Sequence, residues 1–344
     1  MHDADLPQIV VTSTTSLFYL TGLWIDPHER MVALLVKADG SVHLFANEIF
    51  GLKSTQEFPL TVHKDGDDPV ADLAAMLDAG KVGIDKFWYS KFLIGLMQHR
   101  QDVYPIEGSF PVDECRKVKD EDEQEAMRHS SRINDEVMAQ AIHAVHDGVK
   151  ENEMTSLINR EYIARGADCE GAQLACFGVN GADPHHEADN TVLKRGDSIT
   201  FDIFTPISRY WCDMTRTVFY QEVSDKQRKV YELVKNANEA AEKAVKPGVK
   251  LSDLDDIARR IIADGGYGKY FTHRLGHGCG IDCHEPPDVS SSSDAICVPG
   301  MVFSVEPGIY LPGEFGVRIE DLVMVTETGH QVLNSYPKDL MVIS

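Results

Sequence analysis

The chain has 344 residues, of which 43% are hydrophobic and 26% charged, a composition typical of a folded protein. A chain of this length exceeds one ordinary hydrophobic core, which predicts two domains. Its 33 basic and 55 acidic residues give a formal net charge of −22. This charge repels phosphate backbones and anionic lipid, so nucleic acid and membrane surfaces are excluded as expected partners.

Three features predict a cytoplasmic protein. The start, MHDADLPQIV, lacks the basic segment followed by an apolar segment that marks a secretory signal. No apolar run approaches the ~20 residues needed to span a bilayer. The cysteines are odd in number and irregularly spaced, which favours reduced thiols. Cys279 and Cys283 are spaced like half of a thiolate zinc site, but without a second pair we expect them to be small buried residues.

The first third of the chain predicts a small α/β domain over residues 1–115. The strings QIVVTS, MVALLVKADGSVHLFAN and KVGIDKFW are typical of strands, with a hairpin turn at Asp39-Gly40. Residues 69–80 and 90–99 are typical of helices. The string VDECRKVKDEDEQ is predicted to be a charged connector into the second domain, residues 116–344.

The second domain begins with a long predicted helix over residues 120–146. Its apolar residues recur at spacings of three and four, Asp120 and Glu123 form a predicted capping box, and Gly148 follows its end. Further helices are predicted at 151–165, 225–245 and 252–264, and strands at 172–179, 198–204, 210–220, 301–306 and 316–326. Helices and strands mix without a strict βαβ repeat, so this domain is predicted to be α+β.

Four acids on predicted strands stand out as candidate metal ligands. Asp202 and Asp213 lie on consecutive strands that we expect to form a hairpin, in which opposed side chains are about 5 Å apart. Glu306 and Glu320 repeat the arrangement across a second predicted turn. Two carboxylates so close repel one another unless a cation lies between them. Taken singly, each is more commonly a surface strand residue or a turn cap.

Three histidines are candidate partners of these acids. His277 lies between two glycines, which permit close backbone approach. His185 follows a proline in a polar turn, and His284 follows His277 by seven residues. A lone histidine is more commonly a hydrogen-bonded structural residue. These three are candidates for the site mainly because of the sequence strings that surround them.

That context resembles the creatinase/aminopeptidase metallopeptidase family from about Glu121 to the C-terminus. The resemblance rests on the order and spacing of several short strings: Pro184-His185, Leu193-Lys194-Arg195-Gly196-Asp197, Asp213-Met214-Thr215-Arg216-Thr217, His277, His284-Glu285-Pro286 and Val317-Arg318-Ile319-Glu320-Asp321. In the first domain, Tyr19-Leu20-Thr21-Gly22 resembles the start of the proline-directed branch, the Xaa-Pro dipeptidases (prolidases) and Xaa-Pro aminopeptidases. The resemblance implies a pita-bread catalytic domain preceded by a smaller α/β domain.

The resemblance also implies a dinuclear metal centre. Asp202 would bind the first metal, His277 and Glu306 the second, and Asp213 and Glu320 would bridge the two. Four carboxylates balance the charge of two divalent ions and leave room for a bridging hydroxide as nucleophile. Oxygen-rich ligation suits Mn²⁺ or Co²⁺, with Zn²⁺ or Fe²⁺ as alternatives.

The remaining catalytic groups follow from the same resemblance. Glu306 would accept the proton of the attacking water, and His185 and His284 would bind the substrate and stabilise the oxyanion. Arg318 would support the metal ligands or orient the substrate. The expected reaction is hydrolysis of Xaa-Pro dipeptides, with a homodimer as the expected assembly.

Two alternatives remain open at this point. The chain is an Xaa-Pro aminopeptidase acting on longer peptides, or a catalytically silent peptide-binding homologue, although such homologues usually lose ligands that are all present here. Asp288 bears on the first alternative. It occupies the region where some short prolidases carry an arginine that grips the dipeptide carboxylate.

Overall fold

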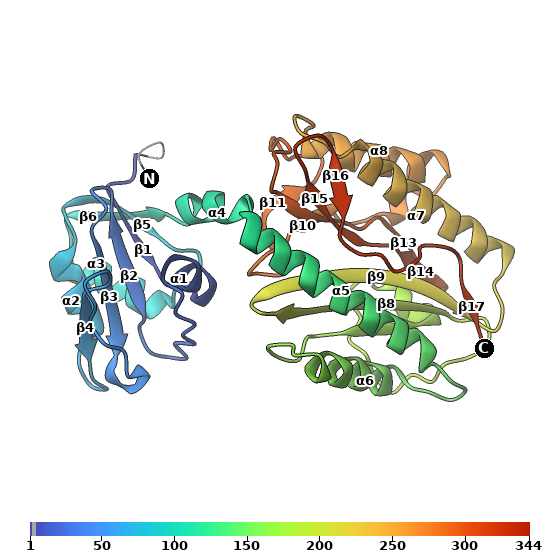
Figure 1. Cartoon of the computed structure of the whole chain (residues 1–344), viewed down its shortest axis with the longest axis horizontal. Helices are drawn as coiled ribbons and strands as arrows, with labels where there is room; N and C mark the ends of the chain where they lie inside the picture. The colour runs from blue at the N-terminus through green and yellow to red at the C-terminus, as the bar shows by residue number, and fades with distance from the viewer. Residues whose placement is uncertain (2–4) are drawn as a thin grey trace. The chain divides into compact units, whose positions relative to one another are not determined.

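The computed structural model describes residue 1 and residues 5–344. Contacts within the chain divide it into two compact units, Met1–Arg116 and Lys117–Ser344 (Figure 1). The smaller unit is α/β and the larger is mixed α+β, which confirms the predicted fold class. No helix in the described part of the chain combines the length and apolar character that crossing a membrane requires.

The first unit is built on one six-stranded sheet, in the order β4-β3-β2-β1-β5-β6. Its strands are β1 (Gln8–Val11), β2 (Ala33–Lys37), β3 (Val42–Asn47), β4 (Leu60–His63), β5 (Gly80–Ile84) and β6 (Val103–Glu107). Its helices are α1 (Thr14–Thr21), α2 (Pro69–Met76), α3 (Ser90–His99) and α4 (Phe110–Lys117), with a short 3₁₀ helix η2 (Glu48–Phe50).

Alternation along the strands of this sheet creates a core on each face. Val10 packs with α2 and α3 on one face, whereas Ile9 and Val11 pack with Leu17 of α1 on the other. The turn at Asp39-Gly40 joins β2 to β3 as predicted. Helix α1 was not predicted, although Ser13 caps it and Gly22 ends it in the left-handed conformation.

The second unit contains the elements from residue 121 onward. Its helices are α5 (Glu121–His143), α6 (Glu151–Ala164), α7 (Asp225–Ala244) and α8 (Leu251–Asp264), with short 3₁₀ helices η3 (Gly178–Ala182) and η4 (Gly268–Tyr270). Its strands are β7 (Leu174–Phe177), β8 (Ser198–Ile207), β9 (Tyr210–Tyr220), β10 (Gly276–Gly278), β11 (Glu285–Val289), β12 (Val302–Val305), β13 (Gly308–Leu311), β14 (Phe315–Arg318), β15 (Asp321–Val325), β16 (His330–Val332) and β17 (Val342–Ile343).

Two helix pairs cover the strands of this unit (Figure 1). Helices α5 and α6 pack on the sheet β17-β9-β8-β7, and α7 and α8 pack on strands of the sheet β11-β10-β12-β15-β16 and on the hairpin β13-β14. The capping box of Asp120 and Glu123 at the start of α5 is confirmed. All seven cysteines are free thiols, as predicted.

Two local predictions were wrong. The charged connector forms the helix α4 over part of its length, because Val112 is buried among the apolar residues of the first unit. The segment 316–326 is not one strand: it ends β14 at Arg318 and begins β15 at Asp321, and these strands belong to different sheets. The break places Glu320 between β14 and β15, outside the strand pairings of both sheets.

Strand alternation on β8 and β9 separates a core face from a cavity face. Phe201 and Ile203 of β8 and Met214 of β9 pack among the residues of α5 and α6. Asp202 and Asp213 therefore face the opposite way, away from these helices. Their arrangement differs from the predicted direct opposition, because Asp202 pairs with Thr215, and Asp213 pairs with Phe204. The two aspartates are diagonal neighbours on one face.

Candidate metal centre and substrate cavity

A cavity of about 570 Å³ lies in the second unit. Its lining contains every residue that the sequence analysis proposed for the site: Asp202, Asp213, His277, Glu306, Glu320, His185, His284 and Arg318. These residues come from segments spread over more than a hundred positions of the chain. The tertiary structure thus brings the whole candidate set to one place.

The two glutamates reach the cavity from neighbouring strands. Glu306 follows the end of β12, and Glu320 precedes the start of β15. The antiparallel pairing of these strands ends with Val305 opposite Asp321, so Glu306 and Glu320 lie just beyond its last pair. The second predicted turn, at Pro312-Gly313 between the two glutamates, joins β13 to β14, which form a separate two-stranded sheet.

His277 completes the cluster from the middle of β10. Its Nε2 lies 3.8 Å from Oδ2 of Asp213 and 3.4 Å from Oε1 of Glu306. One possible ligand atom from each of Asp213, His277 and Glu320 lies within 4.8 Å of the others, and all three residues are buried. Asp213, His277 and Glu320 are therefore close enough to share a cation, with Glu306 beside His277 and Asp202 in the same cavity lining.

The burial of these groups strongly shifts their protonation. Burial raises the pKa of Asp213 and of Glu320 well above the usual range, and the neighbouring carboxylates add to the effect. The pKa of Glu306 rises to about 7 for the same reasons, although Arg318 opposes the shift. Burial, followed by His284, lowers the pKa of His277 to about 3, so its ring is neutral and offers a lone pair.

Unsatisfied oxygen atoms show that this cluster fits a cation. Oδ1 of Asp202 and Oδ1 of Asp213 are buried, and among the residues that the structure describes neither has a hydrogen-bond partner. Buried carboxylates without partners are costly. Oxygen-rich donors with one neutral imidazole suit divalent ions of the Mn²⁺ or Co²⁺ type. The donor set therefore fits divalent metal.

Arg318 and Thr215 hold the carboxylates in place. The Arg318 side chain donates to Oδ2 of Asp202 at 2.6 Å, to the Tyr310 hydroxyl at 2.9 Å and to the Thr215 hydroxyl at 3.0 Å. Thr215 in turn donates to Oε2 of Glu320 at 2.7 Å. Arg318 is buried and engaged with the candidate ligands, so its contacts are those of a group that orients Asp202.

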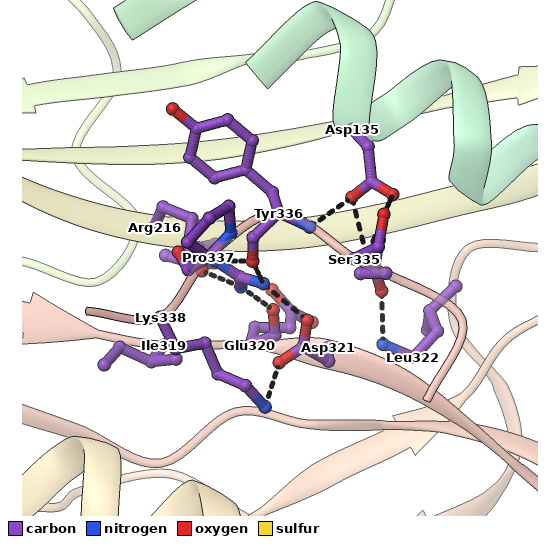
Figure 2. Close-up of polar contacts among 12 residues, drawn as sticks. Asp135, Arg216, Ile319, Glu320, Asp321, Leu322, Ser335, Tyr336, Pro337 and Lys338 are labelled. Atoms are coloured by element: carbon purple, nitrogen blue, oxygen red, sulfur yellow. Dashed lines mark hydrogen bonds and ion pairs between the residues drawn. The ribbon is translucent and has the colours of Figure 1, made fainter. Parts of the chain in front are cut away.

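A second arginine fixes the backbone around Glu320 from the side of α5 and the C-terminal segment (Figure 2). Arg216 donates from Nη1 to the backbone carbonyls of Thr215 and Glu320, at 2.9 and 2.6 Å, and from Nη2 to Oδ1 of Asp321 at 2.7 Å. It also donates to the carbonyls of Tyr336 and Pro337. Arg216 thus ties β9, the start of β15 and the C-terminal segment together.

The two other candidate histidines lie on the cavity wall. The ring of His284 packs edge-on against that of His277, with centroids 4.0 Å apart. Burial lowers the pKa of His284, so its ring is neutral near pH 7 and carries one N–H donor. His185 is exposed on a loop in which its backbone N–H donates to Asp183.

A second acidic group supports the loop that carries His185. One possible ligand atom from each of Glu151, His186 and Asp189 lies within 4.8 Å of the others. The buried Glu151 carboxylate, however, already accepts hydrogen bonds from the backbone N–H groups of Phe177 and Asp189. Its hydrogen-bonding capacity is used to anchor the loop, so this group is structural.

Several residues in the cavity lining or in contact with it escaped the sequence analysis. Tyr310 bridges Arg318 and His273, whose Nε2 lies 2.8 Å from the Tyr310 hydroxyl. Arg274 lines the cavity and forms an ion pair with Asp288. Cys283 also lines it, with Sγ donating to Oδ2 of Asp213 at 3.4 Å. Of these residues, only Thr215 could have been found from the sequence, because strand alternation puts it on the same face as Asp213.

Fold and cavity together define a two-unit protein whose second unit carries a carboxylate-rich candidate site for cations. A family model for metallopeptidase family M24 matches residues 125–327, and a model for the creatinase/prolidase N-terminal domain matches residues 1–118. The chain belongs to metallopeptidase family M24, and its second unit is the pita-bread catalytic domain of that family.

Relatives of known sequence or structure span nearly the whole chain. An uncharacterised peptidase of Staphylococcus saprophyticus is 34% identical over 335 residues, which is 95% of each chain. A dipeptidase from Pyrococcus horikoshii has a TM-score of 0.93 at 34% identity and covers 99% of this chain and 97% of its own. A prolidase from Thermococcus sibiricus has a TM-score of 0.94 at 31% identity, with 99% and 96% covered.

Proposed function

We propose that this metallopeptidase is a dipeptidase that hydrolyses the peptide bond preceding proline. The observation that carries the proposal is the convergence of four carboxylates, two of them buried and two partly buried, and a neutral imidazole on one cavity. The names of two structural relatives, a dipeptidase and a prolidase, support the substrate class.

We assign the metal ligands as the resemblance to the family implies, and the positions of the donor atoms support the assignment. Asp213 and Glu320, which have possible ligand atoms within 4.8 Å of one another and of His277, would bridge two divalent ions. His277 and Glu306, whose donor atoms lie 3.4 Å apart, would hold one ion, and Asp202 would hold the other through the oxygen that Arg318 leaves free. When bound, the two ions would activate water and polarise the peptide carbonyl.

The protein's own side chains would accept the proton of the attacking water and stabilise the negative charge that develops on the carbonyl oxygen. Glu306, with a pKa of about 7, would accept the proton of the attacking water on its carboxylate. His284 and His185 would donate hydrogen bonds to the oxyanion that forms on the carbonyl oxygen. Arg318 would act as a positioning residue, because its guanidinium holds Oδ2 of Asp202.

Apolar side chains in the cavity wall are suited to the proline ring. Ala172, Leu174 and Phe204 line the cavity beside the candidate ligands. A pyrrolidine ring is compact and apolar, so burying it there is favourable. The tertiary amide of proline has no N–H to donate, and these apolar side chains have no hydrogen-bonding groups that would be left without a partner.

The proposal is tested by adding Mn²⁺ or Co²⁺ to the purified protein and measuring the hydrolysis of Leu-Pro, Ala-Pro, Leu-Ala and the tripeptide Leu-Pro-Ala. We expect Leu-Pro and Ala-Pro to be cleaved well above Leu-Ala. Cleavage of Leu-Pro-Ala alone would favour an Xaa-Pro aminopeptidase. Stoichiometric metal without turnover of any peptide would favour a silent peptide-binding homologue. We also propose a homodimer, which sedimentation velocity measures directly.

A further inference from the structure

Arg274 places a cationic side chain in the wall of an otherwise acidic cavity. Of the described residues that line this cavity, two are arginines, Arg274 and Arg318. The side chain of Arg318 is 5% exposed and hydrogen-bonded to Asp202, whereas that of Arg274 is 37% exposed. Arg274 is therefore the arginine that an incoming ligand can reach.

Asp288 holds Arg274 at the solvent side of the cavity. Asp288 lies on β11 directly opposite His277, and Nη1 of Arg274 donates to its Oδ1. The Asp288 side chain is 61% exposed and is not part of the cavity lining. An ion pair this exposed contributes little energy and exchanges readily with other partners. The remaining N–H groups of the guanidinium are available for a second carboxylate.

We propose that Arg274 binds a carboxylate of the substrate and that Asp288 orients the guanidinium for this contact. The inference rests on the proposed peptidase function. The C-terminal carboxylate of a dipeptide lies only one residue beyond the scissile bond, within about 4 Å of chain length. A carboxylate that leaves water for the cavity needs a charged partner, and the guanidinium of Arg274 offers one. Asp288, an acid where some prolidases carry an arginine, then acts through Arg274.

The carboxylate has two possible sources, and matched substrates separate them. Leu-Pro and its amide, Leu-Pro-NH₂, differ only in the charge of the C-terminus. Glu-Pro and Gln-Pro differ only in the charge of the first side chain. If Arg274 binds the C-terminus, Arg274→Met lowers kcat/KM for Leu-Pro by about tenfold or more, as expected for a charged hydrogen bond, and changes that for Leu-Pro-NH₂ by less than about twofold. If it binds an acidic side chain, the loss is confined to Glu-Pro.

Three further variants control this comparison. Arg274→Lys keeps the charge but loses the planar fork, so we expect an intermediate loss. Asp288→Asn keeps Arg274 but removes the charge that orients it. It should raise KM for Leu-Pro by only about threefold and leave KM for Leu-Pro-NH₂ unchanged. Arg195→Met makes the same substitution at an exposed ion pair with Glu222, away from the cavity lining. It should leave kcat/KM unchanged for both Leu-Pro and Leu-Pro-NH₂.

The proposal would be overturned if Arg274→Met lowered kcat/KM equally for Leu-Pro and Leu-Pro-NH₂, and equally for Glu-Pro and Gln-Pro. Arg274 would then be merely structural. If the wild-type protein cleaves no Xaa-Pro peptide, the proposed function fails, and the carboxylate site is tested by binding alone. Calorimetry with Leu-Pro, Glu-Pro and their neutral counterparts, on metal-free and Mn²⁺-loaded protein, should then show a preference for the anion that Arg274→Met removes. No such preference would overturn the inference independently of activity.

Discussion

Arg216 donates a hydrogen bond of 2.6 Å to the backbone carbonyl of Glu320, although the two residues are 104 positions apart in the chain. Arg216 lies three residues after Asp213 on β9, and Glu320 immediately precedes β15. One buried guanidinium thus connects the strands that carry the two residues proposed to bridge the metals. The same guanidinium binds Asp321 and the C-terminal segment (Figure 2).

Replacing Arg216 should damage metal binding as well as stability. Arg216→Met leaves the buried Asp321 carboxylate without this partner, which costs about 3–5 kcal/mol in the free energy of unfolding. Because the carbonyl of Glu320 also loses its donor, we expect Mn²⁺ affinity to fall at least tenfold. Chemical denaturation and metal calorimetry measure the two effects.

Asp135 provides the control for this variant. It accepts hydrogen bonds from the backbone N–H groups of Ser335 and Tyr336, so it holds the same C-terminal segment without touching Glu320. Asp135→Ala should cost about 1 kcal/mol and leave Mn²⁺ affinity unchanged. An equal loss of affinity in both variants would show that stability alone governs the site.

Asp213→Asn should remove at least one metal and nearly all peptidase activity. A neutral amide cannot bridge two divalent ions well, whereas the fold should tolerate the change because burial already penalises the charged carboxylate. Metal content by elemental analysis and thermal unfolding of the metal-free protein measure the two consequences. Retention of two metals and a normal rate would rule out Asp213 as a bridging ligand.

Metal affinity should weaken as the pH falls from 8 to 6. Glu306 has a pKa of about 7 in the metal-free protein, so below pH 7 a cation must displace its proton. His277, with its pKa lowered to about 3, stays neutral throughout this range and does not compete. Calorimetry in buffers of different ionisation enthalpy should show proton release on Mn²⁺ binding, and Glu306→Gln should reduce that release.

The same carboxyl predicts how the stability of the metal-free protein depends on pH. The folded-state pKa of Glu306 is raised above its usual value of 4.5, so the folded protein keeps a proton that the unfolded chain has lost. Its contribution is fully present below about pH 4.5 and is lost as the pH rises through about 7. The stability of the wild type relative to Glu306→Gln should therefore fall over this window, as measured by urea denaturation.

Lys119 and Glu285 form an ion pair of 2.6 Å whose side chains are 1% and 2% exposed. Lys119→Met removes the cation and leaves the Glu285 carboxylate buried, which should cost about 3–5 kcal/mol. The double variant Lys119→Met/Glu285→Gln should recover part of that loss, since no charge remains unpaired. Because Glu285 follows His284, kcat should fall in the single variant more than KM rises. Additive losses in denaturation experiments would contradict this coupling.

Local patterns in the sequence were sufficient for much of the architecture. The spacing of apolar residues predicted α5, and the capping box marked its start at Asp120. The content of β-branched and aromatic residues predicted β9 over residues 210–220, which are its bounds in the structure. These features depend on residues close together in the chain, so they can be recognised without knowing the fold. Helix α1 was missed because it is short, and the packing of Leu17 against the sheet stabilises it.

The sequence by itself determined the inventory of candidate ligands, their order along the chain and the placement of Asp202 and Asp213 on consecutive strands. Only the tertiary structure decided that Asp202 and Asp213 are diagonal neighbours, that Glu306 and Glu320 lie just beyond the last pair of β12 and β15, and that Arg274 lines the cavity while paired with Asp288. The physical reason is that these features depend on contacts between residues that are far apart in the sequence. Register and convergence are set by contacts such as that between Thr215 and Glu320, which joins residues 105 positions apart. Periodicity within a segment carries no information about such contacts.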